Sequence, residues 1–184
     1  MMQQPSNIID LPVTASTDAQ LVESASLGDR QAFSVLIRSC ESMLYRIAWS
    51  ITFSDADAAD ATQEAIFKAW RALPKLRNAN VFRSWLVRIL INECKQVLRQ
   101  RKHRGEMPEL ELIGPSHLSD EALDVRRALL FLPERQRSII MLYYYEDFSV
   151  QHISSVLKLP QGTIKSRLFA ARKALKRLLE VDGE

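Results

Sequence analysis

The chain has 184 residues, of which 47% are hydrophobic and 26% charged, a balance typical of folded globular proteins. The formal net charge is +3 and the pI is near 9.0, which favours a polyanionic partner. No apolar run approaches the ~20 residues of a membrane span. Cys40 and Cys94 lack the spacing of a zinc or redox site, so both are expected to be reduced thiols.

The apolar spacing in the first half of the chain predicts four helices. Residues 1–17 have neither the cationic nor the apolar segment of a signal peptide, and we expect a mobile tail there. Asp18 and Asp29 are the expected N-caps of the first two helices, which Gly28 separates. Pro74 is expected to end the third. The four predicted helices are 18–27, 30–53, 55–73 and 81–101.

The segment 75–80 joins the third and fourth helices and has two asparagines, which cap helices well and tolerate positive φ. The helical pattern then stops at 105–119, an acidic stretch with two glycines and two prolines that is typical of a linker. Later helices are predicted at 120–131, 133–145, 149–157 and 161–180. Because no stretch alternates like a strand, the sequence predicts an all-α protein. It would have two small helical domains, 18–104 and 120–184, joined by a flexible linker.

The last two predicted helices form a helix-turn-helix pattern. Ser149 can cap the first, and residues 158–163 form a compact break. No acidic residue occurs between Lys158 and Arg177. An apolar face and an opposite basic face on the last helix favour a DNA-reading helix over a merely solvated basic one. The apolar face has Ile164, Leu168, Ala171, Leu175 and Leu178.

The third predicted helix has an acidic face, since Asp57, Asp60 and Glu64 are spaced by three and four residues. Such a face could be a metal site, an acid–base pair, a docking surface or a solvated surface. No histidine or second carboxylate cluster accompanies it, and no nucleophile or Gly-rich loop occurs. We therefore expect no enzyme activity, metal or cofactor. Docking to a basic protein surface is favoured, and a solvated face is the alternative.

The charge inverts after this helix, because only Glu93 counters eleven basic residues between positions 68 and 104. Phe82 and Trp85 lie among them, and basic residues interleaved with aromatics suit nucleic acid with exposed bases. Trp85 by itself is expected to be a core residue. The basic residues are Lys68, Arg71, Lys75, Arg77, Arg83, Arg88, Lys95, Arg99, Arg101, Lys102 and Arg104.

These stretches resemble the bacterial RNA polymerase sigma factors. Residues 57–70 (DAADATQEAIFKAW) resemble the polymerase-binding helix, and 82–92 (FRSWLVRILIN) resemble the adjoining helix that engages the −10 promoter element. Residues 132–137 (LPERQR) and 159–168 (LPQGTIKSRL) resemble the domain that reads the −35 element. Two domains and a short linker are the layout of the extracytoplasmic-function (ECF) group, and the resemblance covers about 20 to 180.

The resemblance implies a cytoplasmic promoter-specificity subunit that binds core RNA polymerase and promoter DNA, aids promoter melting and directs transcription initiation. It implies no enzyme activity, cofactor, small-molecule substrate or membrane insertion. It also implies a stress-response role and an anti-sigma factor, often membrane-anchored, as a partner. The alternative that we weigh is a free-standing dimeric helix-turn-helix regulator whose N-terminal helices form the dimer.

The resemblance also assigns the site residues. The polymerase-binding residues would be Asp57, Asp60, Gln63, Glu64 and Phe67. The −10 residues would be Arg77, Asn78, Asn80, Phe82, Arg83, Trp85, Arg88, Asn92, Lys95 and Arg99. The −35 residues would be Gln161, Thr163, Lys165, Ser166, Arg167, Phe169, Arg172 and Lys173. The linker would thread toward the polymerase active-site channel. Ala170 departs from the family, where a basic residue is common.

Overall fold

The computed structural model describes residues 15–105, 128–129 and 131–181. The predictions for the rest of the tail, for the linker beyond Gly105 and for most of the helix at 120–131 lie outside the described residues. Within the described ranges the secondary structure is helical and has no strand, as the sequence predicts. No helix there is both long and apolar enough to cross a membrane.

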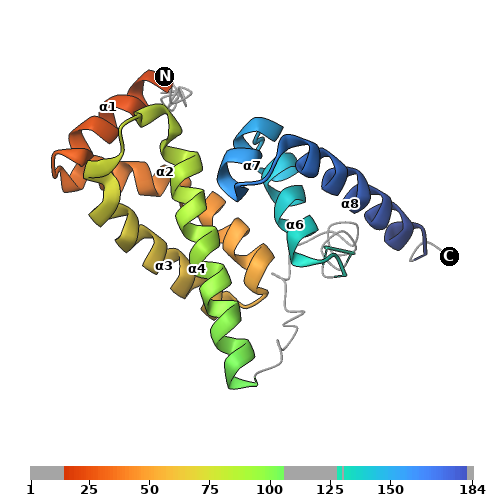
Figure 1. Cartoon of the computed structure of the whole chain (residues 1–184). Helices are drawn as coiled ribbons and strands as arrows, with labels where there is room; N and C mark the ends of the chain where they lie inside the picture. The colour runs from red at the N-terminus through yellow and green to blue at the C-terminus, as the bar shows by residue number, and fades with distance from the viewer. Residues whose placement is uncertain (1–14, 106–127, 130, 182–184) are drawn as a thin grey trace, which may run out of the picture.

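The N-terminal unit packs four helices: α2, α3 and α4 all contact one another, and α1 packs on α2 (Figure 1). Two short 3₁₀ helices, η1 (Leu73–Lys75) and η2 (Ala79–Val81), join α3 to α4. The helices are α1 (Ala15–Ser26), α2 (Arg30–Thr52), α3 (Asp55–Ala72) and α4 (Phe82–Arg104).

The C-terminal unit is the predicted helix-turn-helix with a supporting helix before it (Figure 1). The helix predicted at 133–145 has the expected extent, but its last five residues widen into a π-helix, η3, which the apolar spacing does not reveal. The described helices are α6 (Glu134–Ile140), η3 (Met141–Tyr145), α7 (Val150–Leu157) and α8 (Gln161–Val181).

Side-chain caps fix the starts of three of the described α-helices. The Asp29 carboxylate accepts hydrogen bonds from the backbone amides of Gln31 and Ala32 at 2.8 and 3.1 Å. Ser54 and Ser149 cap α3 and α7 in the same way, so these three predicted starts are confirmed. The predicted cap at Asp18 is wrong, because α1 begins at Ala15 and places Asp18 in its first turn.

Helix α4 is longer than predicted because of its C-terminal cap. The sequence predicts an end near Arg101, but the helix continues to Arg104. Gly105 then adopts the left-handed conformation, with φ of 72°, and its amide donates to the carbonyls of Arg101 and Lys102. This conformation costs a glycine little, because it has no Cβ, so the glycine sets the end of the helix.

A continuous hydrophobic core runs through both units. In the N-terminal unit, Leu44, Ile47, Leu86 and Leu90 are fully buried. In the C-terminal unit, Leu142, Ile153 and Ile164 are fully buried. Helix α2 contacts α6 and helix α4 contacts α7, so the two units pack against each other directly.

Candidate protein-docking and nucleic-acid interface

Helix α3 buries one face and exposes the other. Its alanines at 58, 61, 65 and 69 are buried, which brings α2 and α4 close to its backbone. The opposite face is exposed and has Asp60, Gln63 and Glu64, with the Phe67 ring 54% exposed beside them. Aromatic side chains are enriched at protein-docking surfaces, so the exposed Phe67 ring marks this face as a candidate.

Two of the predicted docking carboxylates form ion pairs with cations of the same unit. Asp57 lies 2.5 Å from Arg101 of α4, and both side chains are about four-fifths buried. Glu64 lies 3.3 Å from Lys68, in an exposed pair. Asp60 forms no ion pair with any residue that the structure describes. Asp60 and Glu64 therefore remain available to a partner, while Arg101 already neutralises much of the charge of Asp57.

Glu93, the one carboxylate among the basic residues between positions 68 and 104, pairs with Lys68. Its side chain is 9% exposed and lies 2.6 Å from the Lys68 ammonium. This hydrogen bond raises the pKa of Lys68, and the pair ties α3 to α4. The groove between these helices has a volume of about 640 Å³. Its lining includes Gln96 and Gln100 of α4, which the sequence reasoning missed because they are distant in sequence from the acidic face.

The turn between α3 and α4 exposes the polar residues assigned to the −10 strand. Arg77, Asn78 and Asn80 are all exposed. The Asn78 side chain accepts a hydrogen bond from the Asn80 amide at 3.0 Å. Asn78 has φ of −130°, so it caps η2 and needs no left-handed backbone. The turn is thereby held in one shape with its side chains in solvent.

The two aromatic residues at the start of α4 differ in exposure. Phe82 is 3% exposed and belongs to the core, so the prediction that its ring contacts bases does not fit this structure. Its position on the apolar stripe of α4 explains its burial. Trp85 is half-buried against the core, with its ring centroid 6.0 Å from that of Phe82. The exposed part of Trp85 is the aromatic surface left for a base.

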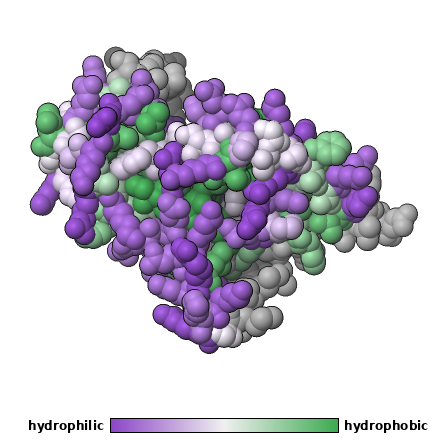
Figure 2. All heavy atoms as spheres, in the orientation of Figure 1, coloured by the Kyte–Doolittle hydropathy of each residue, from purple (hydrophilic) through white to green (hydrophobic). Residues whose placement is uncertain are grey.

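A row of polar residues continues down α4, whose hydrophilic surface reaches its C-terminal end (Figure 2). Arg88, Asn92, Lys95 and Arg99 follow one another at steps of four, three and four residues, which places them on one face. Arg83 lies outside this row and pairs with Asp18 at 3.2 Å.

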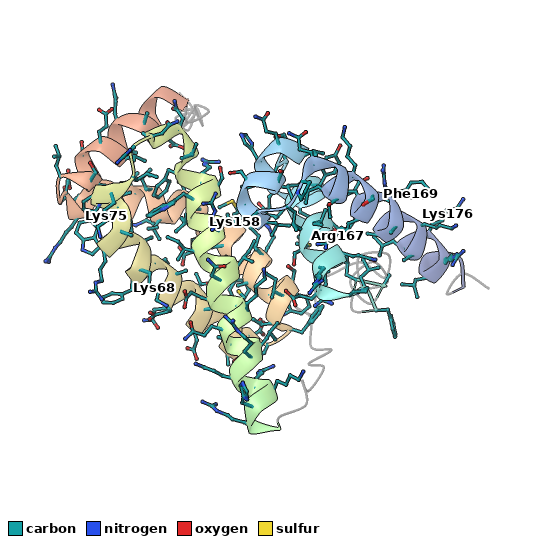
Figure 3. All side chains as sticks on the ribbon, viewed as in Figure 1. Lys68, Lys75, Lys158, Arg167, Phe169 and Lys176 are labelled. Atoms are coloured by element: carbon teal, nitrogen blue, oxygen red, sulfur yellow. The ribbon has the colours of Figure 1, made fainter. Side chains whose placement is uncertain are left out.

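Helix α8 has the predicted amphipathic character. Ile164, Leu168 and Ala171 are buried, while Thr163 and Arg167 are half-buried. Phe169 is 66% exposed and lies on the outer side of α8, away from the N-terminal unit (Figure 3). The exposed −35 candidates are Gln161, Lys165, Ser166, Phe169, Arg172 and Lys173.

Metal and thiol chemistry find no support in this architecture. Within the described ranges, no three His, Cys, Asp or Glu residues gather as a metal site would require. Cys40 and Cys94 are both buried, and burial raises the pKa of the Cys94 thiol to about 12.

Both units of the chain match known protein families. The family Sigma-70 region 2 matches residues 36–104, and the family Sigma-70, region 4 matches residues 122–175. The RNA polymerase sigma-H factor of Pseudomonas aeruginosa is 31% identical over 91% of this chain and 96% of its own length. The ECF RNA polymerase sigma factor SigM of Mycobacterium tuberculosis is 35% identical over 89% of this chain and 85% of its own. The chain belongs to the ECF group of RNA polymerase sigma factors.

Solved structures agree with this sigma-factor fold. The sigma factor RpoE of Bartonella quintana, solved with the anti-sigma factor NepR, is 27% identical and matches with a TM-score of 0.73 over 82% of this chain and 98% of its own. The fold is also that of CnrH, solved with the cytosolic domain of CnrY, with a TM-score of 0.70 at 24% identity over 92% of this chain and 100% of its own.

Membership in the family establishes the activity. This sigma factor is a promoter-specificity subunit that works with core RNA polymerase and promoter DNA in transcription initiation, and it is not an enzyme. The predicted family and function are confirmed, and the free-standing dimeric regulator is not favoured.

Proposed function

We propose that this sigma factor binds core polymerase through the exposed face of α3. The observation that carries this assignment is the exposed Asp60 carboxylate, which pairs with no cation of the described residues and lies on the same face as the exposed Phe67 ring. Glu64 and Gln63 extend the surface along the helix. Asp57 lies at its edge and contributes less, because it is paired with Arg101. A basic surface of the polymerase is the complementary partner.

The −10 strand would meet the turn before α4 and the polar row along that helix. Arg77, Asn78 and Asn80 are exposed and can contact a base that has left the stack. Unstacking a base costs a few kcal/mol, which pocket contacts must offset. Arg88, Asn92, Lys95, Arg99 and the more distant Arg83 would hold phosphates and sugars. Trp85 would support the base from the side, and the buried Phe82 would position the turn.

The −35 element would meet α8 in the major groove. Lys165, Ser166 and Phe169 are exposed near the N-terminal end of the helix, where base edges are read. The Phe169 ring can contact a thymine methyl group. Gln161, Thr163 and Arg167 lie beside them, while Arg172 and Lys173 follow on the exposed side and would hold the DNA backbone.

Regulation by an anti-sigma factor is the remaining part of the proposal. The sigma factor RpoE, which has this fold, was solved with the anti-sigma factor NepR. We extend this kind of partner, which can itself be membrane-anchored, to the present chain. The chain would act in the cytoplasm, where polymerase and DNA are found. The proposed domains are 18–104 and 120–184, with 105–119 as the linker toward the active-site channel.

Charge reversal on α3 tests the polymerase assignment. Asp60→Arg together with Glu64→Arg is expected to abolish co-purification with core polymerase, because cations would then face the basic partner. Both residues are exposed, so the circular dichroism spectrum should not change. Glu23→Arg, on the exposed side of α1, is the control for Asp60→Arg alone, because each substitution changes the net charge by the same amount. Co-purification with core polymerase is compared between these two variants. Undiminished co-purification of the double variant would refute the assignment.

A further inference from the structure

A cavity between the two units is lined mainly by cations. Its volume is about 590 Å³, which lies within the range of small-molecule sites, about 300–1,000 Å³. Helix α4 forms one wall, and α6, the end of α7 and α8 form the other (Figure 1). Three basic residues of α4 and two of the C-terminal unit line it: Lys95, Arg99, Lys102, Arg135 and Arg167.

These five cations have no carboxylate to balance them among the described residues. None of them forms an ion pair there. Glu134 is the one acidic residue of the described lining, and it pairs with none of them. A cleft lined by one sign of charge focuses its potential and concentrates counter-ions. The packing of the two units therefore creates a place that favours an anion.

Two of these cations have no part in the DNA or polymerase surfaces proposed above. Lys102 belongs to α4 and Arg135 to α6, so they lie on opposite walls of the cavity. Both side chains are exposed and accessible to a ligand. Promoter binding accounts for Lys95, Arg99 and Arg167, but it does not account for the cation that α6 adds to the cavity.

The placement of charge on both walls fits an anion with at least two phosphate groups. Arginine binds phosphate through two parallel hydrogen bonds, and lysine binds it as a point charge. A single phosphate held by the cations of α4 would leave Arg135 and Arg167 without a partner. A diphosphate can meet the cations of both walls.

The cavity also has an apolar side. Leu98 of α4, Leu157 of α7 and Leu159 in the turn before α8 are half-buried and line it, next to the buried Ile91. An organic group placed over these leucines would remove their remaining apolar surface from water, which favours binding. The fitting ligand thus has a diphosphate end and an organic body.

A hydrogen bond beside the cavity holds its two walls in place. Nη2 of Arg88 donates to the Ser155 carbonyl of α7 at 2.9 Å. Arg88 lies three residues before Ile91 on α4, and Ser155 lies two residues before Leu157 on α7. A site whose walls are already positioned needs less ordering when a ligand binds.

We propose that this cavity binds a small organic diphosphate, of the class of the nucleoside diphosphates, as a regulatory ligand that is neither a substrate nor a cofactor. A ligand that contacts both walls stabilises the arrangement in which the units are packed. Lys95 and Arg99 also belong to the proposed −10 surface, so the ligand and the −10 strand compete for them. This competition rests on the proposed role of α4, whereas the site itself does not.

Isothermal titration calorimetry of the full chain tests the site in the absence of DNA. The probes are adenosine diphosphate (ADP), adenosine monophosphate (AMP) and inorganic pyrophosphate, in buffer without magnesium. ADP is expected to bind one per chain and about tenfold more tightly than AMP, because one charge-assisted hydrogen bond contributes about that factor. It should also bind more tightly than pyrophosphate, which has no organic body to cover the leucines.

Matched variants test whether both walls take part. Lys102→Gln and Arg135→Gln should each weaken ADP binding by about tenfold. Lys75→Gln removes the same charge at an exposed position of η1 that is outside the cavity lining and on the side of the N-terminal unit away from the C-terminal unit (Figure 3). This control should bind ADP as the wild type does. Transcription by core polymerase without ADP should be unchanged in all three variants.

Competition is measured with a −10 single-stranded oligonucleotide. ADP should displace it from the wild-type chain, and Arg135→Gln should require about tenfold more ADP for the same displacement, in line with its weaker binding. If ADP bound to the chain without displacing an oligonucleotide, the regulatory part of the proposal would be overturned. Failure of the −10 assignment is seen separately, as unchanged oligonucleotide binding by Arg99→Gln without ADP.

Several calorimetric results would overturn the site itself. One is a wild-type chain that binds no ADP, and another is AMP or pyrophosphate binding as tightly as ADP. Equal weakening by Lys75→Gln would mean that ADP is attracted only by the overall positive charge. Unchanged affinity of Arg135→Gln would mean that the C-terminal wall does not contact the ligand.

Discussion

Removal of the Arg137 side chain tests the energetics of the interface between the two units. In Arg137→Ala, the buried carbonyls of Ser50 and Leu132 lose their donor, at about 2 kcal/mol each. Loss of the contact with the Phe53 ring adds about 2 kcal/mol for a desolvated cation–π pair. The gross loss is therefore about 6 kcal/mol.

Removal of a buried charge offsets part of this loss. Burial lowers the pKa of Arg137 to about 10 from the ordinary 12.5, which corresponds to roughly 3 kcal/mol spent on holding the charge inside the protein. The variant no longer has that cost. The expected net loss in the free energy of unfolding is about 3 kcal/mol, which is a large fraction of the total stability of a small domain.

Urea unfolding followed by circular dichroism measures this loss. With a slope of about 2 kcal/mol per molar urea, the midpoint should fall by about 1.5 M. Arg135→Ala, an exposed position on the same helix, is the control and should change the free energy of unfolding by no more than about 0.5 kcal/mol. If the midpoint of Arg137→Ala stayed within about 0.2 M of the wild type, the reasoning about the buried guanidinium would be refuted.

Three further predictions follow from single features of the fold. Asp29→Ala removes the α2 cap and should lower the free energy of unfolding by about 1 kcal/mol; an unchanged urea midpoint would show that the cap is dispensable. Cys94, with its thiol pKa raised to about 12, should not react with Ellman's reagent at pH 8 until urea unfolds the chain, and rapid reaction in buffer would contradict its burial. Phe169→Ala should weaken promoter use by ~1–3 kcal/mol in transcription with core polymerase if the ring contacts a base, with stability unchanged because Phe169 is exposed; unaffected transcription would remove it from the −35 contacts.

Local signals in the sequence predicted most of the helices. Asp29, Ser54 and Ser149 begin helices where a capping side chain is expected, because a cap bonds to amides only two or three residues away. The apolar steps of α8 likewise predicted which face is buried. The same kind of signal misled at Asp18, which lies in the first turn of α1 rather than before it.

The candidate surfaces were predictable as charge patterns, but their pairing was not. The acidic face of α3 and the basic row of α4 follow from helical spacing alone. The pairing of Asp57 with Arg101, and of Lys68 with Glu93, depends on how α3 packs against α4. The same holds for Phe82, whose aromatic ring suggested base stacking but belongs to the core.

The helical class, the helix-turn-helix and the family could be predicted from the amino-acid sequence, because they depend on residue types at short, fixed spacings. The packing of the two units against each other could not be predicted in this way, because it depends on contacts such as Arg46 with Glu146, which are one hundred residues apart. A single arginine or glutamate gives no sign in the sequence of which distant partner it will meet. That choice is made by the packing of whole helices, which sets the distance between groups of opposite charge.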